Sequence, residues 1–125
     1  KNAGFSTGQP WLAVNPNYQA INVQEALANP DSIFYTYQKL VQIRKENSWL
    51  IQADFELLDT ADKVFAYIRK DGDRRFLVVA NLSNEKQDLT VEGEVKSVLI
   101  ENTLVQEIFE KHILAPWDAF CVELL

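Results

Sequence analysis

The spacing of apolar residues changes once along this chain, close to Asn47. Before that point they recur every three or four positions, which is the period of one helix face. After it they alternate with polar residues, and this period of two is typical of half-buried strands. The sequence therefore predicts an α+β chain in which a long helix precedes short antiparallel strands that form a β-sandwich.

Two helix starts are predicted before the change of period. Asn22, followed three positions later by Glu25, has the form of a capping box and opens a short helix that ends near Leu27. Asn29-Pro30 is typical of an N-cap and a first helical residue, so a second helix is expected from there to about Glu46. The apolar face of this second helix comprises Ile33, Phe34, Tyr37, Leu40 and Val41.

Arg44 projects into that apolar face at 3.6 residues per turn. Two interpretations remain open. The side chain can snorkel to the last helical carbonyls or to water. Alternatively, it forms an ion pair with a carboxylate on the surface that the helix covers.

The second part of the sequence predicts about seven short strands. Asp71-Gly72 is the strongest hairpin signal, and Glu92-Gly93 separates two later strands. The predicted strands span residues 55–58, 64–69, 76–82, 88–91, 95–100, 107–109 and 119–124.

Charge and apolar run length exclude several functions. The chain has eighteen Asp and Glu against twelve Lys and Arg. Nucleic-acid binding depends on clustered cations, so no nucleic-acid partner is expected. No apolar run approaches the ~20 residues of a membrane helix, and no signal peptide is recognisable. We therefore expect no membrane partner and a cytoplasmic location.

The carboxylates offer no convincing active site. A pair about 5 Å apart could hydrolyse a glycosidic bond with retention. The close pairs, Asp59 with Asp62 and Asp71 with Asp73, flank turns, where aspartates usually bind their own backbone. The sequence also lacks a Gly-rich phosphate loop, a histidine cluster and a nucleophile elbow. We expect no catalytic, cofactor-binding or metal-binding residue, and no cofactor.

Cys121 is the only cysteine and His112 the only histidine. Together they form the one conceivable thiol–imidazole pair. Cys121 lies in a strand-like run, which favours a buried small hydrophobic residue over a nucleophile.

Four aromatic residues could stack on sugars. Trp49 follows the long helix and Trp117 follows Pro116, so both are expected to seal a core. The roles of Trp11 and Tyr18 are left open.

The opening segment, residues 2–18, is rich in glycine, proline and aromatic residues and has no period. We expect it to lie against a surface built by residues outside this sequence. The first residue, Lys1, and the absence of Met fit a piece of a larger protein.

Several motifs in the first 45 residues are specific enough to compare with known families. They are Asn2-Ala-Gly-Phe5, Gly8-Gln-Pro-Trp11, Val14-Asn-Pro-Asn-Tyr18, Ile21-Asn-Val23, Ser32-Ile-Phe-Tyr-Thr-Tyr-Gln-Lys-Leu40 and Ile43-Arg-Lys45. These motifs resemble the end of the catalytic barrel in α-glucosidases of glycoside hydrolase family 13, and the nearest group contains trehalose-6-phosphate hydrolase, oligo-1,6-glucosidase and dextran glucosidase. A looser resemblance to the closing β domain of these enzymes follows in residues 76–83 and 114–119.

The resemblance implies two domains. Residues 1–47 would be the last loop and helix of the barrel, and residues 48–125 a C-terminal antiparallel Greek-key β-sandwich. The family's catalytic aspartate, glutamate and second aspartate precede this segment, so none corresponds to a residue here. The chain would stabilise the catalytic barrel, its partner, and would meet the α-glucoside substrate only through the parent enzyme.

Three alternatives follow for the parent protein. Phe34-Tyr-Thr-Tyr37 and Val64-Phe-Ala-Tyr67 favour trehalose-6-phosphate hydrolase. An oligo-1,6-glucosidase or dextran glucosidase is the second. The third is a free-standing carbohydrate-binding or interaction β-sandwich. A bare apolar face on the long helix would count against this third alternative.

Overall fold

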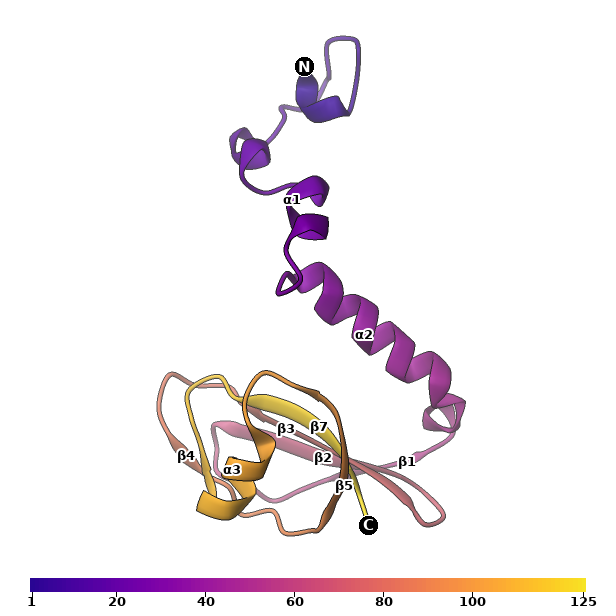
Figure 1. The fold of residues 1–125 in the computed structure, drawn as a ribbon, viewed down its shortest axis with the longest axis vertical. Coiled ribbons are helices and arrows are strands. Elements are labelled where there is room, and N and C mark those ends of the chain that lie inside the picture. The colour runs from indigo at the N-terminus through magenta and orange to yellow at the C-terminus, as the bar shows by residue number, and fades with distance from the viewer. The chain divides into compact units, whose positions relative to one another are not determined.

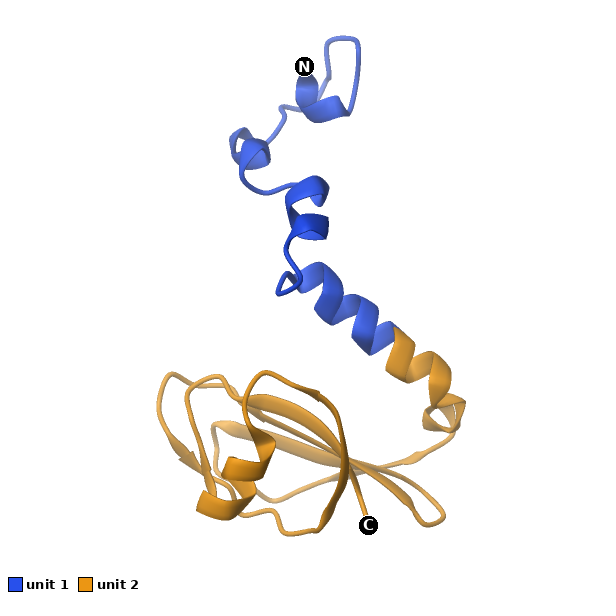
Figure 2. Ribbon diagram, viewed as in Figure 1, with its two compact units in different colours: residues 1–41 blue, residues 42–125 orange.

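The computed structural model describes residues 1–125 and divides into two compact units. Unit 1 comprises residues 1–41 and unit 2 residues 42–125 (Figure 2). No helix in either unit combines the length and apolar character needed to span a bilayer.

Unit 1 consists of short helical segments (Figure 1). Hydrogen bonds between side chains and nearby backbone groups fix the conformation of these segments. Asn22 Oδ1 accepts from the Glu25 backbone N–H at 2.9 Å, so the predicted N-cap of the first helix is confirmed. None of residues 1–41 is buried. The segments are η1 (Asn2–Gly4), η2 (Pro16–Gln19), α1 (Val23–Ala28) and the first part of α2 (Ile33–Glu46).

The second helix begins at Ile33, so its predicted start at Asn29-Pro30 is wrong. Asn29 instead ends α1 by donating its backbone N–H to the Glu25 carbonyl at 3.1 Å. Its side-chain Oδ1 accepts from the Asp31 N–H at 3.0 Å, which makes a local turn. An Asx turn and an N-cap use the same side-chain oxygen, which is why the sequence suggested a helix start here.

Unit 2 is built on a five-stranded sheet with the order β1-β2-β3-β7-β5, in which all neighbours are antiparallel. The predicted hairpin joins β2 and β3, and Gly72 there has a φ of 59°, a left-handed conformation that favours glycine. A two-stranded sheet pairs β4 with β6. The strands are β1 (Asp54–Leu57), β2 (Val64–Asp71), β3 (Arg74–Asn81), β4 (Gln87–Asp88), β5 (Val95–Glu101), β6 (Ile113–Leu114) and β7 (Ala119–Leu124).

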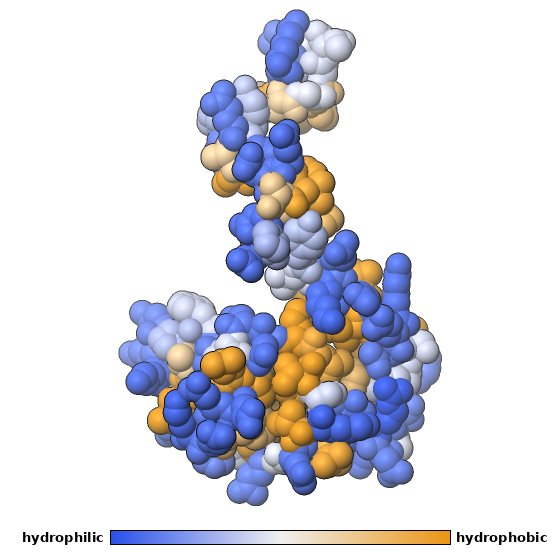
Figure 3. All heavy atoms as spheres, in the orientation of Figure 1, coloured by the Kyte–Doolittle hydropathy of each residue, from blue (hydrophilic) through white to orange (hydrophobic).

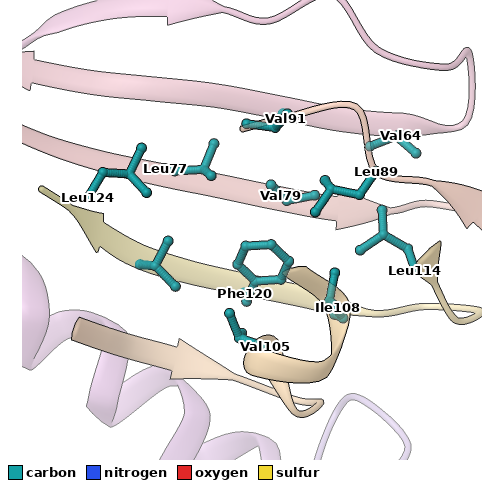
Figure 4. Close-up of a cluster of buried hydrophobic side chains, with 12 residues drawn as sticks. Val64, Leu77, Val79, Leu89, Val91, Val105, Ile108, Leu114, Phe120 and Leu124 are labelled. Atoms are coloured by element: carbon teal, nitrogen blue, oxygen red, sulfur yellow. The ribbon is translucent and has the colours of Figure 1, made fainter. Parts of the chain in front are cut away.

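The core of unit 2 lies on one face of the large sheet, which we call the inner face (Figure 4). β2, β3 and β7 contribute alternate residues to it, as a period of two requires. The opposing layer comes from β6, α3 (Val105–Lys111) and the segment after β4. The buried cluster comprises Val64, Ala66, Leu77, Val79, Leu89, Val91, Val105, Ile108, Leu114, Phe120, Val122 and Leu124.

The predicted weak strand at residues 107–109 is wrong, because this segment forms the helix α3. Val105 and Ile108 are three residues apart and both face the core, which is a helical spacing. Glu101 Oε2 accepts from the Val105 N–H at 3.0 Å and so satisfies one donor at the helix start. His112 ends the helix in a left-handed conformation with a φ of 54°. The strand predicted for residues 88–91 is mostly wrong, because β4 is Gln87–Asp88 and residues 89–91 lie outside any strand, although Leu89 and Val91 are buried.

Asn81, at the end of β3, is a buried polar residue whose side chain is fully hydrogen-bonded. Its Nδ2 donates to the carbonyls of Glu85 and Ala115, both at 2.8 Å. Its Oδ1 accepts from the hydroxyl of Ser83 at 2.7 Å and from the Ser83 N–H at 3.1 Å. The amide therefore joins two connecting segments to the end of the central strand.

Replacing Asn81 with leucine should destabilise unit 2. The substitution removes the acceptor of the buried Ser83 N–H and hydroxyl, at about 1–3 kcal/mol for each buried group, and also the donor to the carbonyls of Glu85 and Ala115. Asn84→Leu in the same loop is the matched control, because Asn84 is exposed. Urea unfolding of the chain followed by circular dichroism measures both changes. Equal midpoints for Asn81→Leu and Asn84→Leu would contradict the role of this network.

Limited proteolysis should remove unit 1 before it cuts unit 2. Residues without burial open at little cost in free energy, whereas the strands of unit 2 share one core. A broad-specificity protease and mass spectrometry would identify the surviving fragment. Early cleavage within β3 would refute its position at the centre of the sheet.

Candidate functional surface

The paired carboxylates lie in exposed turns. Asp59 and Asp62 are exposed in the connection between β1 and β2, and Asp71 and Asp73 are exposed at the β2–β3 hairpin. Solvent-facing turns lack the enclosed surroundings in which catalytic carboxylates usually lie. No group of three or more His, Cys, Asp and Glu residues could hold a metal ion. The absence of catalytic residues stays a prediction for this chain.

Cys121 has the environment of a structural thiol. It lies on the face of β7 opposite to Phe120 and Val122 and is partly buried. Burial raises the pKa of the thiol from its ordinary value of 9.0 to about 12. A nucleophilic cysteine needs the opposite shift, towards thiolate at neutral pH. His112 is exposed at the end of α3.

Trp49 packs as predicted, whereas Trp117 does not. The Trp49 ring meets Phe76 edge to face, with 4.8 Å between ring centroids. The Arg74 guanidinium lies 4.7 Å from the centroid of the same indole, a cation–π contact. Trp117 is exposed, so the prediction that it seals the core of this chain is wrong. Among the residues left open, Trp11 is exposed and Tyr18 is partly buried.

Unit 1 has an exposed apolar surface on α2. We define the helix surface as Ile33, Phe34, Tyr37 and Val41, all of which are exposed. Ile33 is 75% exposed and Tyr37 67%, values expected of polar surface residues. Hydrophobic residues, drawn in orange, reach the surface of both units in Figure 3. A row of aromatic and aliphatic residues on one helix face indicates contact with another protein surface.

Arg44, in the last turn of α2, is exposed. The ion pairs of the chain are Lys63–Glu85, Lys96–Glu123 and Lys111–Glu107, and Arg44 is in none of them. Within these 125 residues the structure therefore agrees with a solvated or snorkelling side chain.

Cys121 should react slowly with iodoacetamide in the folded chain, because a thiol with a pKa of about 12 is almost entirely protonated at pH 8. Asn84→Cys in a Cys121→Val background is the exposed control and should react at least about a hundredfold faster. The raised pKa also predicts how stability depends on pH. The contribution of the protonated thiol to the free energy of unfolding is complete below the unfolded pKa of 9.0 and is lost as pH rises towards about 12. Equal alkylation rates of the two thiols would contradict this environment.

Two family models match the chain. Residues 1–53 match "Alpha amylase, catalytic domain", and residues 55–121 match "Maltogenic Amylase, C-terminal domain". The two matches meet at the start of β1.

Individual relatives agree with the family models. A glucan 1,6-alpha-glucosidase of Streptococcus pneumoniae serotype 4 is 90% identical over 125 residues, which is all of this chain and 23% of the relative. A trehalose-6-phosphate hydrolase of Escherichia coli K12 is 45% identical over 87 residues, 69% of this chain and 16% of the relative. The crystal structure of Bacillus licheniformis trehalose-6-phosphate hydrolase matches with a TM-score of 0.81 and 34% identity, over 98% of this chain and 24% of that one.

These matches agree with the architecture and with the motifs in the sequence. The chain spans less than a quarter of the length of the relatives it matches, such as 23% of the streptococcal enzyme. It combines the end of an α-amylase catalytic domain with a C-terminal antiparallel domain. The chain therefore belongs to the α-amylase family of glycoside hydrolases, glycoside hydrolase family 13.

Proposed function

We propose that this chain serves as the end of the catalytic barrel and the C-terminal domain of a glucan 1,6-α-glucosidase. In this role it stabilises the catalytic domain by packing and takes no part in bond cleavage. We put the boundary between the two parts near residue 47, after the end of α2 at Glu46, although the match to the catalytic domain extends to residue 53. The reacting carboxylates would then lie in the part of the enzyme outside these 125 residues.

The observation that carries this proposal is the lack of any buried residue in unit 1. Its local conformation is fixed by hydrogen bonds such as those of Asn22, yet its apolar side chains have no internal core. Burial of apolar surface is the main favourable term in folding, so a segment of this kind gains its stability from another surface. The rest of a catalytic domain would supply that surface.

The specific member of the family is chosen by similarity. Identity to the glucan 1,6-alpha-glucosidase is 90% over the full chain, against 45% over 87 residues for the trehalose-6-phosphate hydrolase. Trehalose-6-phosphate hydrolase remains the second candidate. A free-standing carbohydrate-binding sandwich has less support, because the helix surface is bare within this chain. A cytoplasmic location stays a prediction from the sequence.

The proposal predicts a clear division of activity. The 125-residue chain should release no glucose from isomaltose, dextran or trehalose-6-phosphate, because a retaining site needs two cooperating carboxylates. The longer protein that contains this chain should hydrolyse isomaltose and dextran, and act far more weakly on trehalose-6-phosphate. Glucose release is measured against heat-inactivated samples. Hydrolysis by the 125-residue chain alone, or a preference of the longer protein for trehalose-6-phosphate, would overturn the proposal.

A further inference from the structure

The core of unit 2 is incompletely covered on one side, where the edge strand β5 faces the helix α3 (Figure 1). Val98 of β5 lies opposite the buried Val122 of β7, so its side chain belongs to the inner face of the sheet. Val95 lies opposite Leu124 and shares that face. Val98 is nevertheless 45% exposed, and Val95 is only partly buried. The layer that covers the inner face therefore stops short of the last strand.

A groove of about 510 Å³ lies between β5 and α3. Its volume falls within the range of about 300–1,000 Å³ that is typical of small-molecule sites. The Phe109 ring, part of its apolar lining, packs against Phe120 with 5.9 Å between centroids and stays partly exposed. We define the lateral groove by six of its lining residues, which are Glu94, Val95, Val98, Gln106, Phe109 and Glu110.

The polar side chains of the lateral groove are Glu94, Gln106 and Glu110, and all three are exposed. Another carboxylate of α3, that of Glu107, is already paired with Lys111. Glu94 and Glu110 are in none of the ion pairs of the chain, and no Lys or Arg lines the groove. The groove therefore presents two unpaired carboxylates and an amide beside apolar side chains, without a cation.

This combination suits a neutral sugar. Sugar hydroxyls donate hydrogen bonds to carboxylates and exchange them with amides, and the apolar face of a pyranose ring can lie on aromatic and aliphatic side chains. A phosphorylated sugar or another anion would meet the carboxylates of Glu94 and Glu110 with no cation to offset their charge.

An added peptide strand fits this edge of the sheet poorly. Such a strand needs a regular row of free backbone groups on the edge strand. β5 shifts its register against β7 twice, between Val95 and Ser97 and between Val98 and Ile100. Irregularities of this kind bend an edge strand and protect it from pairing with another chain. The observations therefore favour a sugar over a peptide.

We propose that the lateral groove is an accessory binding site for a neutral α-1,6-linked glucan chain. The choice of glucan rests on the proposed function, whose substrate can be a polymer with many equivalent glucose units. A polymer held at a second site keeps its chain ends near the enzyme and so raises their effective concentration. The groove takes no part in bond cleavage, so hydrolysis of a short substrate gains nothing from it.

The test compares two variants of the longer protein that contains this chain. Gln106→Ala/Glu110→Ala removes two polar groups of the groove, and Glu107→Ala is the matched control on the same helix. Each variant loses one carboxylate, and all three side chains are exposed, so both variants should keep the fold. Thermal melts check the fold. The readouts are hydrolysis of isomaltose, hydrolysis of long dextran, and retardation in native gels that contain dextran.

The double variant should have a KM for dextran at least about fivefold higher than the control, because it lacks two hydrogen-bonding groups for the glucan. Its kcat, and its kcat/KM for isomaltose, should equal those of the control. The two variants should migrate alike in gels without dextran, and the double variant should be retarded less in gels with dextran. Equal retardation and an equal dextran KM for the two variants would overturn the inference.

Isomaltose hydrolysis by the unchanged longer protein separates this inference from the proposed function. Hydrolysis of isomaltose, with no effect of the double variant on dextran, overturns the inference alone. Retardation by dextran that depends on the groove, without hydrolysis of isomaltose, overturns the proposed function and supports the groove. A lysine-rich apolar peptide, followed by fluorescence anisotropy, should not bind there. Peptide binding that the double variant loses would mean a peptide site and would overturn the inference.

Discussion

The structure of unit 2 depends on the pairing of β3 with both β2 and β7. The β2 contact is local and is closed by the hairpin at Gly72. The β7 contact joins residues about forty-five positions apart in sequence, such as Leu77 and Val122. Leu77, Val79 and Val122 are fully buried in the sheet that contains both pairings. The inner core, α3 and the hydrogen bonds of Asn81 all rely on this central strand.

A small set of contacts connects this sheet to the residues that precede it in the sequence. Arg74 of the hairpin lies over the Trp49 indole and donates to Asn47 Oδ1 at 3.0 Å. Asn47 in turn donates through Nδ2 to the Ile43 carbonyl at 2.9 Å, in the last turns of α2. Arg69 fixes the carbonyls just before β1. The end of the catalytic-domain match is therefore attached to the sheet by cations that satisfy backbone and amide oxygens.

Periodicity predicted the parts of the fold that local chemistry decides. The β7 strand at residues 119–124 and the Asn22 cap agree with the structure, because alternation and capping depend on near neighbours. The helix α3 was not predicted, because three apolar residues, Val105, Ile108 and Phe109, are too few to distinguish a helical period from a short strand. In addition, Glu101, whose carboxylate accepts from the first N–H of the helix, lies in another element, β5. The exposure of Trp117 and of Phe55 and Leu57 in β1 could not be predicted, because alternation assigns a strand two faces without saying what covers each.

The position of β7 has a consequence for biosynthesis. A ribosome delivers β2 and β3 well before β5, α3 and β7, so the central strand spends this interval with one edge unpaired. Translation at roughly 5–20 residues per second makes the interval several seconds, long enough for chaperones or proteases to engage the open edge. A product truncated before Ala119 would retain the hairpin but would lack the core residues Phe120, Val122 and Leu124. The core of unit 2 therefore cannot be completed until β7 has been made.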